Sequence, residues 1–143
     1  ALTPPRWCNG MASRSLDDLA APVKSAALAM LARCRAAGLE VLIYCTLRSN
    51  DEQAALYAQG RTKPGPVLTN AGPGRSMHNP DASGRAWAFD AVPLVSGKAA
   101  WDDVVMVTKM GEIGEACGLE WAGRWRGPLR ERVHFQMPRG AAV

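Results

Sequence analysis

The sequence predicts an α+β fold in a single domain, residues 1–143, in which about three helices pack against a small, mostly antiparallel sheet. A length of 143 residues, with 48% hydrophobic and 21% charged residues, suits one globular domain with its own core. Segments with a helical repeat of apolar residues alternate with short apolar runs that favour strands. No internal repeat or linker divides the chain, and residues 1–14, which lack periodicity, are predicted to form an extended arm.

Start and stop signals mark the three predicted helices. A capping pattern and a terminal glycine predict the first helix over residues 15–38. A second capping box predicts a helix over residues 49–60. The third is expected over about residues 100–117, although Gly111 and Gly114 inside it each cost about 1 kcal/mol relative to alanine.

Short apolar runs predict strands at residues 41–45, 86–92 and 133–137, and Pro93 is expected to end the second of them. Residues 61–75 are rich in glycine and proline and contain no periodic pattern. A loop of this length inside a compact domain usually carries a function.

Composition excludes some classes of function and leaves others open. The net charge of +4 suits an anionic partner but does not identify one. Basic residues do not alternate with aromatic ones on a face, so no nucleic-acid partner is expected. No apolar run approaches the ~20 residues of a membrane helix, so no stable membrane insertion is expected either. We also expect no export signal at the start of the chain, and four cysteines that stay as thiols in a reducing compartment.

The residues that suggest chemistry are the two histidines and two nearby acids. His78 follows the glycine-rich loop, and His134 lies near the end of the chain. Asp90 sits in an apolar run, where an unpaired carboxylate is costly to bury. A metal ion, an arginine partner or exposure at a strand end would each remove that cost. Glu131 precedes His134 by three positions, so the two side chains could converge on one water if the segment is a strand or tight turn.

The chain carries several short motifs in a defined order. They are Ser76-x-His78, Gly84-x-Ala86 with Ala88-x-Asp90, and Glu131-x-x-His134-Phe135. Two further segments, residues 46–62 and 118–125, match the same pattern. This combination resembles the zinc peptidase family of D-Ala-D-Ala carboxypeptidases and dipeptidases, which also contains the L-alanyl-D-glutamate endopeptidases of phage endolysins. The resemblance covers roughly residues 15–138 and implies the fold shared by Hedgehog and the D-Ala-D-Ala peptidases.

The resemblance also implies a role for each matched residue. His78, Asp90 and His134 would be the ligands of a zinc ion, and Glu131 would be the general base. Arg48, Ser76 and Gln53 would bind or orient the substrate, with Gln53 supporting Arg48 from the following helix.

One departure from the family pattern concerns the spacing of the first two ligands. The family has His-x-x-Gly-x-Ala-x-Asp, whereas Asp90 here follows His78 by twelve positions. We interpret residues 79–83 as an inserted turn, because Asn-Pro and Ser-Gly are strong turn signals. Asp81, three positions after His78, is the rival ligand.

The function implied by the resemblance is zinc-dependent hydrolysis of the peptidoglycan stem peptide, at the L-alanyl-D-glutamate bond. A monomeric phage endolysin would accumulate in the host cytoplasm, be released to degrade the periplasmic cell wall, and so cause host lysis. Two alternatives remain open: a D-Ala-D-Ala carboxypeptidase or dipeptidase on the same scaffold, and a non-catalytic domain that binds the cell wall.

Overall fold

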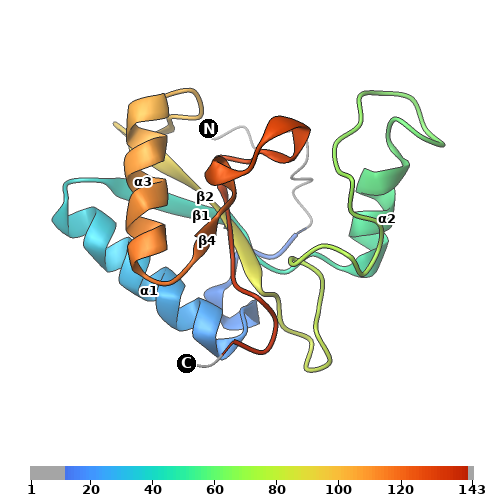
Figure 1. Cartoon of the computed structure of the whole chain (residues 1–143), viewed down its shortest axis with the longest axis horizontal. Coiled ribbons are helices and arrows are strands. Elements are labelled where there is room, and N and C mark those ends of the chain that lie inside the picture. Colours follow the sequence, from blue (N-terminus) through green and yellow to red (C-terminus); the bar gives the residue numbers. More distant parts are fainter. Residues whose placement is uncertain (1–11, 142–143) are drawn as a thin grey trace.

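The computed structural model describes residues 12–141, and its sheet is antiparallel throughout (Figure 1). The elements are η1 (Leu16–Asp18), α1 (Ala21–Ala36), β1 (Glu40–Cys45), α2 (Asn50–Ala58), β2 (Ala88–Val95), β3 (Lys98–Ala99), α3 (Val104–Ala116), β4 (Glu120–Trp121), η2 (Ala122–Arg124), η3 (Gly127–Leu129) and β5 (His134–Gln136). The strands follow the order β1-β2-β5-β4, and β3 pairs with the far end of β2. The predicted α+β class is confirmed.

The helices lie on opposite sides of the sheet. Figure 1 shows α1 and α3 side by side against one face, while α2 and the loop after it stand on the other side. The main core lies beneath α1 and α3 and includes Met30, Phe89, Val107, Met110 and Phe135, all with no exposed surface. Each such side chain contributes about 1.5–3 kcal/mol when it leaves water. The face toward α2 is therefore free to hold a site.

The first helix begins later than predicted. Ser15 does cap a helix, but it is the short η1, where its side chain accepts a hydrogen bond from the amide of Asp17. The chain then straightens, because Leu19 forms a bridge with Ala86 and the amide of Ala20 donates to the Ala86 carbonyl. The α1 helix starts only at Ala21, with a proline in its first turn.

The prediction that Pro93 ends its strand is wrong, since β2 runs from Ala88 to Val95. The carbonyl of Pro93 accepts a hydrogen bond from Ala100, on the side of β2 away from β1. In a strand, the N–H and the C=O of one residue point to the same side, so the nitrogen of Pro93 also faces away from β1. The β5 strand pairs with β2 only as far as Asp90, so β5 requires no hydrogen bond from the N–H that Pro93 lacks.

The third helix also starts later than predicted, at Val104, because Asp103 accepts a hydrogen bond from the amide of Met106 and caps it. The two glycines inside α3 serve close packing. A Cβ atom on Gly111 would lie 2.2 Å from the Trp121 ring, and one on Gly114 would lie 2.5 Å from the Phe135 ring. These glycines let α3 approach the sheet closely.

Part of the predicted N-terminal arm lies outside the described residues, as do Trp7 and Cys8. Ser13 lies inside them and exchanges backbone hydrogen bonds with Thr46 and Leu47, so this part of the arm is extended along the chain that follows β1. Cys34 and Cys117 are free thiols. Within residues 12–141, every helix is too short or too polar to cross a bilayer.

We predict that Gly111→Ala lowers the free energy of unfolding by about 1–3 kcal/mol, because the added methyl group overlaps the buried Trp121 ring. On an ordinary helix surface the same change would be stabilising. Urea unfolding measures the effect, and Glu112→Ala, at the next and exposed position, should stay within about 0.5 kcal/mol of the wild type. A more stable Gly111→Ala protein would contradict the proposed packing role.

Candidate functional site

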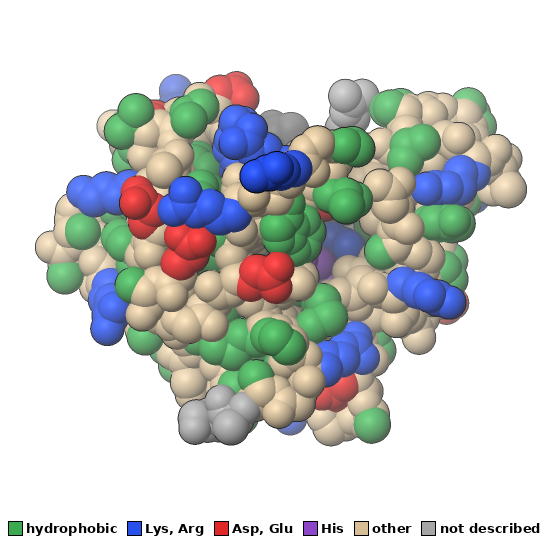
Figure 2. Space-filling model, viewed as in Figure 1, with side chains coloured by type: hydrophobic (Ala, Val, Ile, Leu, Met, Phe, Trp, Pro, Cys, Tyr) green, Lys and Arg blue, Asp and Glu red, His purple; other side chains and the backbone are tan. Residues whose placement is uncertain are grey.

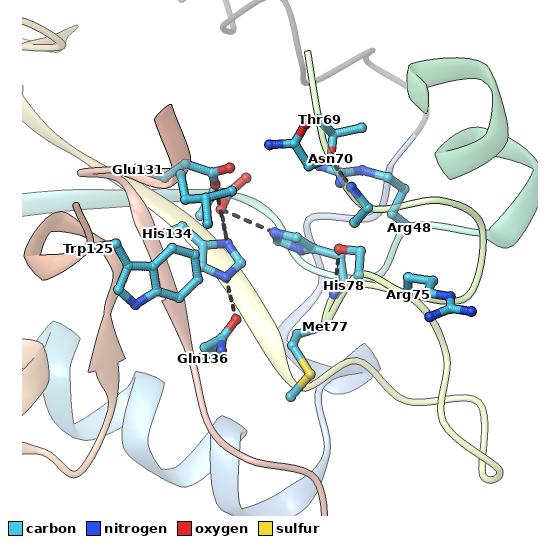
Figure 3. Close-up of a pocket in the computed structure, with 14 residues that line it drawn as sticks. Arg48, Thr69, Asn70, Arg75, Met77, His78, Trp125, Glu131, His134 and Gln136 are labelled. Atoms are coloured by element: carbon cyan, nitrogen blue, oxygen red, sulfur yellow. Dashed lines mark hydrogen bonds and ion pairs between the residues drawn. The ribbon is translucent and has the colours of Figure 1, made fainter. Parts of the chain in front are cut away.

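A pocket of about 430 Å³ opens on the face of the sheet turned toward α2. Its floor comes from β2 and β5, and its walls come from the loop before His78 and from the segment between β4 and β5. Figure 2 shows this hollow near the middle of the molecule, with a small patch of histidine surface visible inside it. Figure 3 shows the side chains that line the pocket.

Strand pairing brings the three predicted metal ligands together. Asp90 on β2 lies directly opposite His134 on β5, and His78 arrives from the glycine-rich loop. One carboxylate oxygen, Oδ1 of Asp90, lies 3.1 Å from Nε2 of His78 and 3.1 Å from Nδ1 of His134. All three side chains are buried at the bottom of the pocket.

Hydrogen bonds fix which ring nitrogen of His78 carries a proton. Its Nδ1 lies 2.7 Å from the carbonyl oxygen of Thr46, which can only accept, so Nδ1 must donate. A neutral imidazole then presents a lone pair at Nε2, toward Asp90.

His134 is oriented in the same way. Its Nε2 lies 2.8 Å from Oε1 of Gln136, which leaves the lone pair on Nδ1, again toward Asp90. Figure 3 shows both imidazoles turned toward this point. Two nitrogen lone pairs and one carboxylate oxygen thus converge, and such a set needs a cation between its members.

The electrostatics around Asp90 agree with a cation site. Burial opposes ionisation of Asp90, but the two neighbouring imidazoles outweigh it and hold the pKa of its carboxyl below the usual range. Burial lowers the pKa of His134, but the hydrogen bond and charge of Asp90 outweigh that effect and raise it. Without a metal, a proton would therefore lie between Asp90 and His134, and a bound metal ion would displace it.

Cys45 is a further neighbour that the sequence did not suggest. Ligand atoms of Cys45, His78 and Asp90 lie within 4.8 Å of one another, so this group could also hold a metal. The Cys45 sulfur, however, lies 3.8 Å from Nδ1 of His78, the nitrogen that faces the Thr46 carbonyl. It also accepts a hydrogen bond from Arg48 at 3.6 Å.

Glu131 stands above the three converging groups. Its Oε2 lies 3.8 Å from Nδ1 of His134, and 42% of the side chain remains exposed to the pocket and solvent. The turn that carries it is closed by Trp121, whose indole donates to the carbonyl of Arg132 at 2.7 Å. Burial raises the pKa of Glu131, and the charge of Asp90 adds to this effect while the nearby cations oppose it.

Arg48 lies on the opposite wall from Glu131 (Figure 3). Its guanidinium is 5% exposed and donates from Nη1 to Oε1 of Gln53 at 3.0 Å. Gln53 in turn donates to the carbonyl of Ala71 in the pocket loop. Within the described part of the chain no acidic side chain forms an ion pair with Arg48, so its charge remains available to a ligand.

The loop before His78 is held together by two polar side chains. Ser76, at the pocket wall, accepts a hydrogen bond from the amide of His78. Asn79 is fully buried, accepts from the amides of Gly74 and Ser76, and donates to the carbonyl of Arg48. Sequence reasoning placed Asn79 in the inserted turn and missed this role, for which the sequence gives no local signal.

Asp81 lies away from the pocket. Its carboxylate accepts hydrogen bonds from Ser83, from the amide of Arg85 and from the indole of Trp87, and these contacts lower the pKa of Asp81. It closes the inserted turn. Gln136 is the other residue that sequence reasoning missed, although a period of two places it on the same strand face as His134.

Comparisons with known proteins find similar proteins both by sequence and by structure. The chain is 34% identical over 132 residues to the peptidoglycan L-alanyl-D-glutamate endopeptidase CwlK of Bacillus subtilis, covering 85% of this chain and 74% of that protein. The crystal structure of the L-Ala D-Glu endopeptidase ChiX of Serratia marcescens superposes with a TM-score of 0.62 at 20% identity, covering 90% of this chain and 89% of that one. This second match supports the fold alone. No protein-family model matches the chain.

We predict that the purified protein binds about one equivalent of a divalent transition metal, and that Asp90→Asn abolishes this binding. The matched control is Asp81→Asn, which should keep the metal because Asp81 is engaged in its own turn. Metal content after dialysis, measured by mass spectrometry, decides between the two carboxylates.

His134→Ala and Cys45→Ser separate the two ways of completing the ligand set. We expect His134→Ala to lose the metal and Cys45→Ser to retain it, because the Cys45 sulfur lies 3.8 Å from Nδ1 of His78, the ring nitrogen that donates to the Thr46 carbonyl. The opposite pattern would make Cys45 the third ligand.

Proposed function

Because the chain belongs to the peptidase family that contains the peptidoglycan L-alanyl-D-glutamate endopeptidases, we propose that it is a zinc-dependent peptidase that cleaves this bond in the stem peptide. The observation that carries the proposal is the convergence of two imidazole lone pairs and the Asp90 carboxylate at the floor of a pocket. Glu131 stands beside them, with its Oε2 3.8 Å from Nδ1 of His134, and within residues 12–141 its side chain forms no hydrogen bond to another group.

The metal would be held by Nε2 of His78, Oδ1 of Asp90 and Nδ1 of His134. Two imidazoles and one carboxylate are typical ligands of catalytic zinc, which keeps a further position open. When bound, zinc would act as a Lewis acid, which polarises the scissile carbonyl and makes water a better nucleophile. The backbone carbonyl of Thr46 and the side chain of Gln136 keep the two rings in the orientation that this requires.

Glu131 would act as the general base. Its Oε2 accepts the proton of the attacking water and later donates it to the leaving amino group of D-glutamate. The raised pKa of Glu131 favours this, since a base with a pKa closer to the working pH returns its proton more readily. Its partial exposure leaves one side of the carboxylate open to the substrate.

Arg48 would bind an anionic group of the substrate. Its guanidinium is held by Gln53 and Cys45, so it presents fixed donors rather than a mobile charge. A stem peptide offers the carboxylate of D-glutamate next to the cleaved bond, and the scissile carbonyl acquires negative charge during attack. Ser76, which orients His78, lies at the same wall.

The remaining wall is partly apolar. Trp125, Leu129 and Met77 line the pocket, and the Trp125 ring lies 5.8 Å from the His134 ring. Their apolar side chains suit the methyl group of alanine. The volume of about 430 Å³ falls in the range of small-ligand sites, so a short stretch of peptide fits, with the rest of the polymer outside.

We further propose that the enzyme serves as a phage endolysin that stays in the host cytoplasm until release and then acts as a monomer on the periplasmic wall. Residues 46–62 and 118–125 resemble the phage members of the family. A net charge of +4 suits an anionic wall polymer.

We predict that Glu131→Gln reduces the turnover rate by about 10²–10⁴-fold while leaving the zinc content unchanged, because the amide cannot accept the proton. Turnover on purified peptidoglycan and metal content are measured on the same preparation. Glu112→Gln, which makes the same change on the exposed surface of α3, serves as the control. Full activity in Glu131→Gln would remove Glu131 from the mechanism.

The bond that is cleaved is identified by the new chain ends. We expect digestion of purified peptidoglycan to yield free carboxyl ends on L-alanine and free amino ends on D-glutamate, detected by mass spectrometry after labelling of the new amines. Released D-alanine would instead identify a D-Ala-D-Ala carboxypeptidase. Binding to the wall with no new ends, by a protein that contains zinc, would favour the non-catalytic alternative.

A further inference from the structure

We propose that Glu120 and Gln136 are positioning residues, which together set the proton on Nε2 of His134 and so keep its Nδ1 available to the metal. This inference rests on the proposed metal site but concerns residues that the mechanism does not require to touch the substrate. Glu120 lies on β4, outside the pocket lining, and its side chain is exposed.

The direction of each hydrogen bond follows from Glu120. An ionised carboxylate can only accept, so Oε2 of Glu120 accepts from the amide group of Gln136, at 3.3 Å. The Gln136 oxygen is then turned toward His134 and accepts from its Nε2, at 2.8 Å. Nε2 therefore carries the proton, and the lone pair on Nδ1 faces Asp90.

The reversed arrangement is unfavourable at both ends. If the Gln136 amide turned over, its oxygen would face the Glu120 carboxylate and two acceptors would meet. Its NH₂ group would then face Nε2 of His134 and favour a lone pair there. The proton would move to Nδ1, where it would block the metal. The charge on Glu120 therefore selects the tautomer of His134 through Gln136.

The sheet register holds this chain of contacts in place. Glu120 and Gln136 are direct partners in the β4–β5 ladder, and Gln136 lies on the same strand face as His134. The neighbour of Glu120, Trp121, points into the core and anchors the short strand. Backbone pairing thus sets the contacts among the side chains of Glu120, Gln136 and His134.

The second oxygen of Glu120 holds the pocket wall. Its Oε1 accepts a hydrogen bond from the indole of Trp125 at 2.9 Å. The Trp125 ring lies 5.8 Å from the His134 ring (Figure 3). One carboxylate outside the pocket therefore positions both a proposed metal ligand and the aromatic wall above it.

Three variants test the direction of the hydrogen bonds. Gln136→Leu removes the acceptor for His134 at similar volume. Glu120→Gln removes the charge that orients Gln136. The double variant Glu120→Gln with Gln136→Glu restores every direction, because the amide introduced at position 120 donates to the carboxylate introduced at position 136, which accepts from His134. The control for lost surface charge is Glu112→Gln.

The first measurement is the dissociation constant of zinc, obtained by competition with a chelator. Gln136→Leu should raise it by about 10–100-fold. Glu120→Gln should raise it in the same direction, the double variant should recover most of that loss, and Glu112→Gln should match the wild type. If Glu120→Gln also matches the wild type, or if the double variant is as weak as the single one, the inference is wrong.

The second measurement separates positioning from a general loss of structure. The chain has only two histidines, so the ring nitrogens of the zinc-loaded enzyme can be assigned in a ¹H–¹⁵N spectrum. The Nε2 proton of His134 should be protected from solvent exchange in the wild type and the double variant, and lose that protection in Glu120→Gln. Equal protection in all of them would overturn the inference. A wild-type protein that fails to bind zinc would instead refute the proposed function.

Discussion

The structure depends on one buried carboxylate. Asp90 lies in the second strand of the sheet order, paired with Cys45 on one side and His134 on the other, and its side chain has almost no contact with solvent. Such a group is costly unless charge or hydrogen bonds compensate for lost hydration. Here the compensating groups are two imidazoles from distant parts of the chain, each already oriented by another acceptor. This arrangement suits a cation placed between the carboxylate and the two imidazoles.

One face of the sheet packs the core, and the other face carries the candidate site. The α1 and α3 helices bury the apolar face, and α3 comes close only because Gly111 and Gly114 lack side chains. The other face carries the pocket, whose walls are loops fixed by specific polar contacts, such as those of Asn79 and Trp121. Loops held in this way can present charged groups at fixed positions without forming a core of their own.

Much of the fold follows from the sequence, because the signals involved are local, whereas the roles of the candidate site residues were implied by the family resemblance. Caps and glycines placed the three helices, and the apolar context of Asp90 indicated a buried carboxylate. The start of α1 and the passage of β2 through Pro93 could not be predicted, since both depend on pairing with remote strands or loops. Gln136 was missed for a similar reason: its role appears only when β4 pairs with β5 and brings Glu120 beside it.

The inserted turn shows why the unusual spacing of His78 and Asp90, the first two proposed ligands, does not keep them apart. The turn closes on itself, because the amide of Asp81 donates to the carbonyl of Arg85 at 2.9 Å and the Asp81 carboxylate caps the residues between them. The indole of Trp87 also donates to this carboxylate, while the Trp87 amide donates to the carbonyl of Met77. The inserted segment thus begins and ends close to His78. Extra residues that close in this way add length without changing the register of β2, and Asp90 reaches the same point as it would without them.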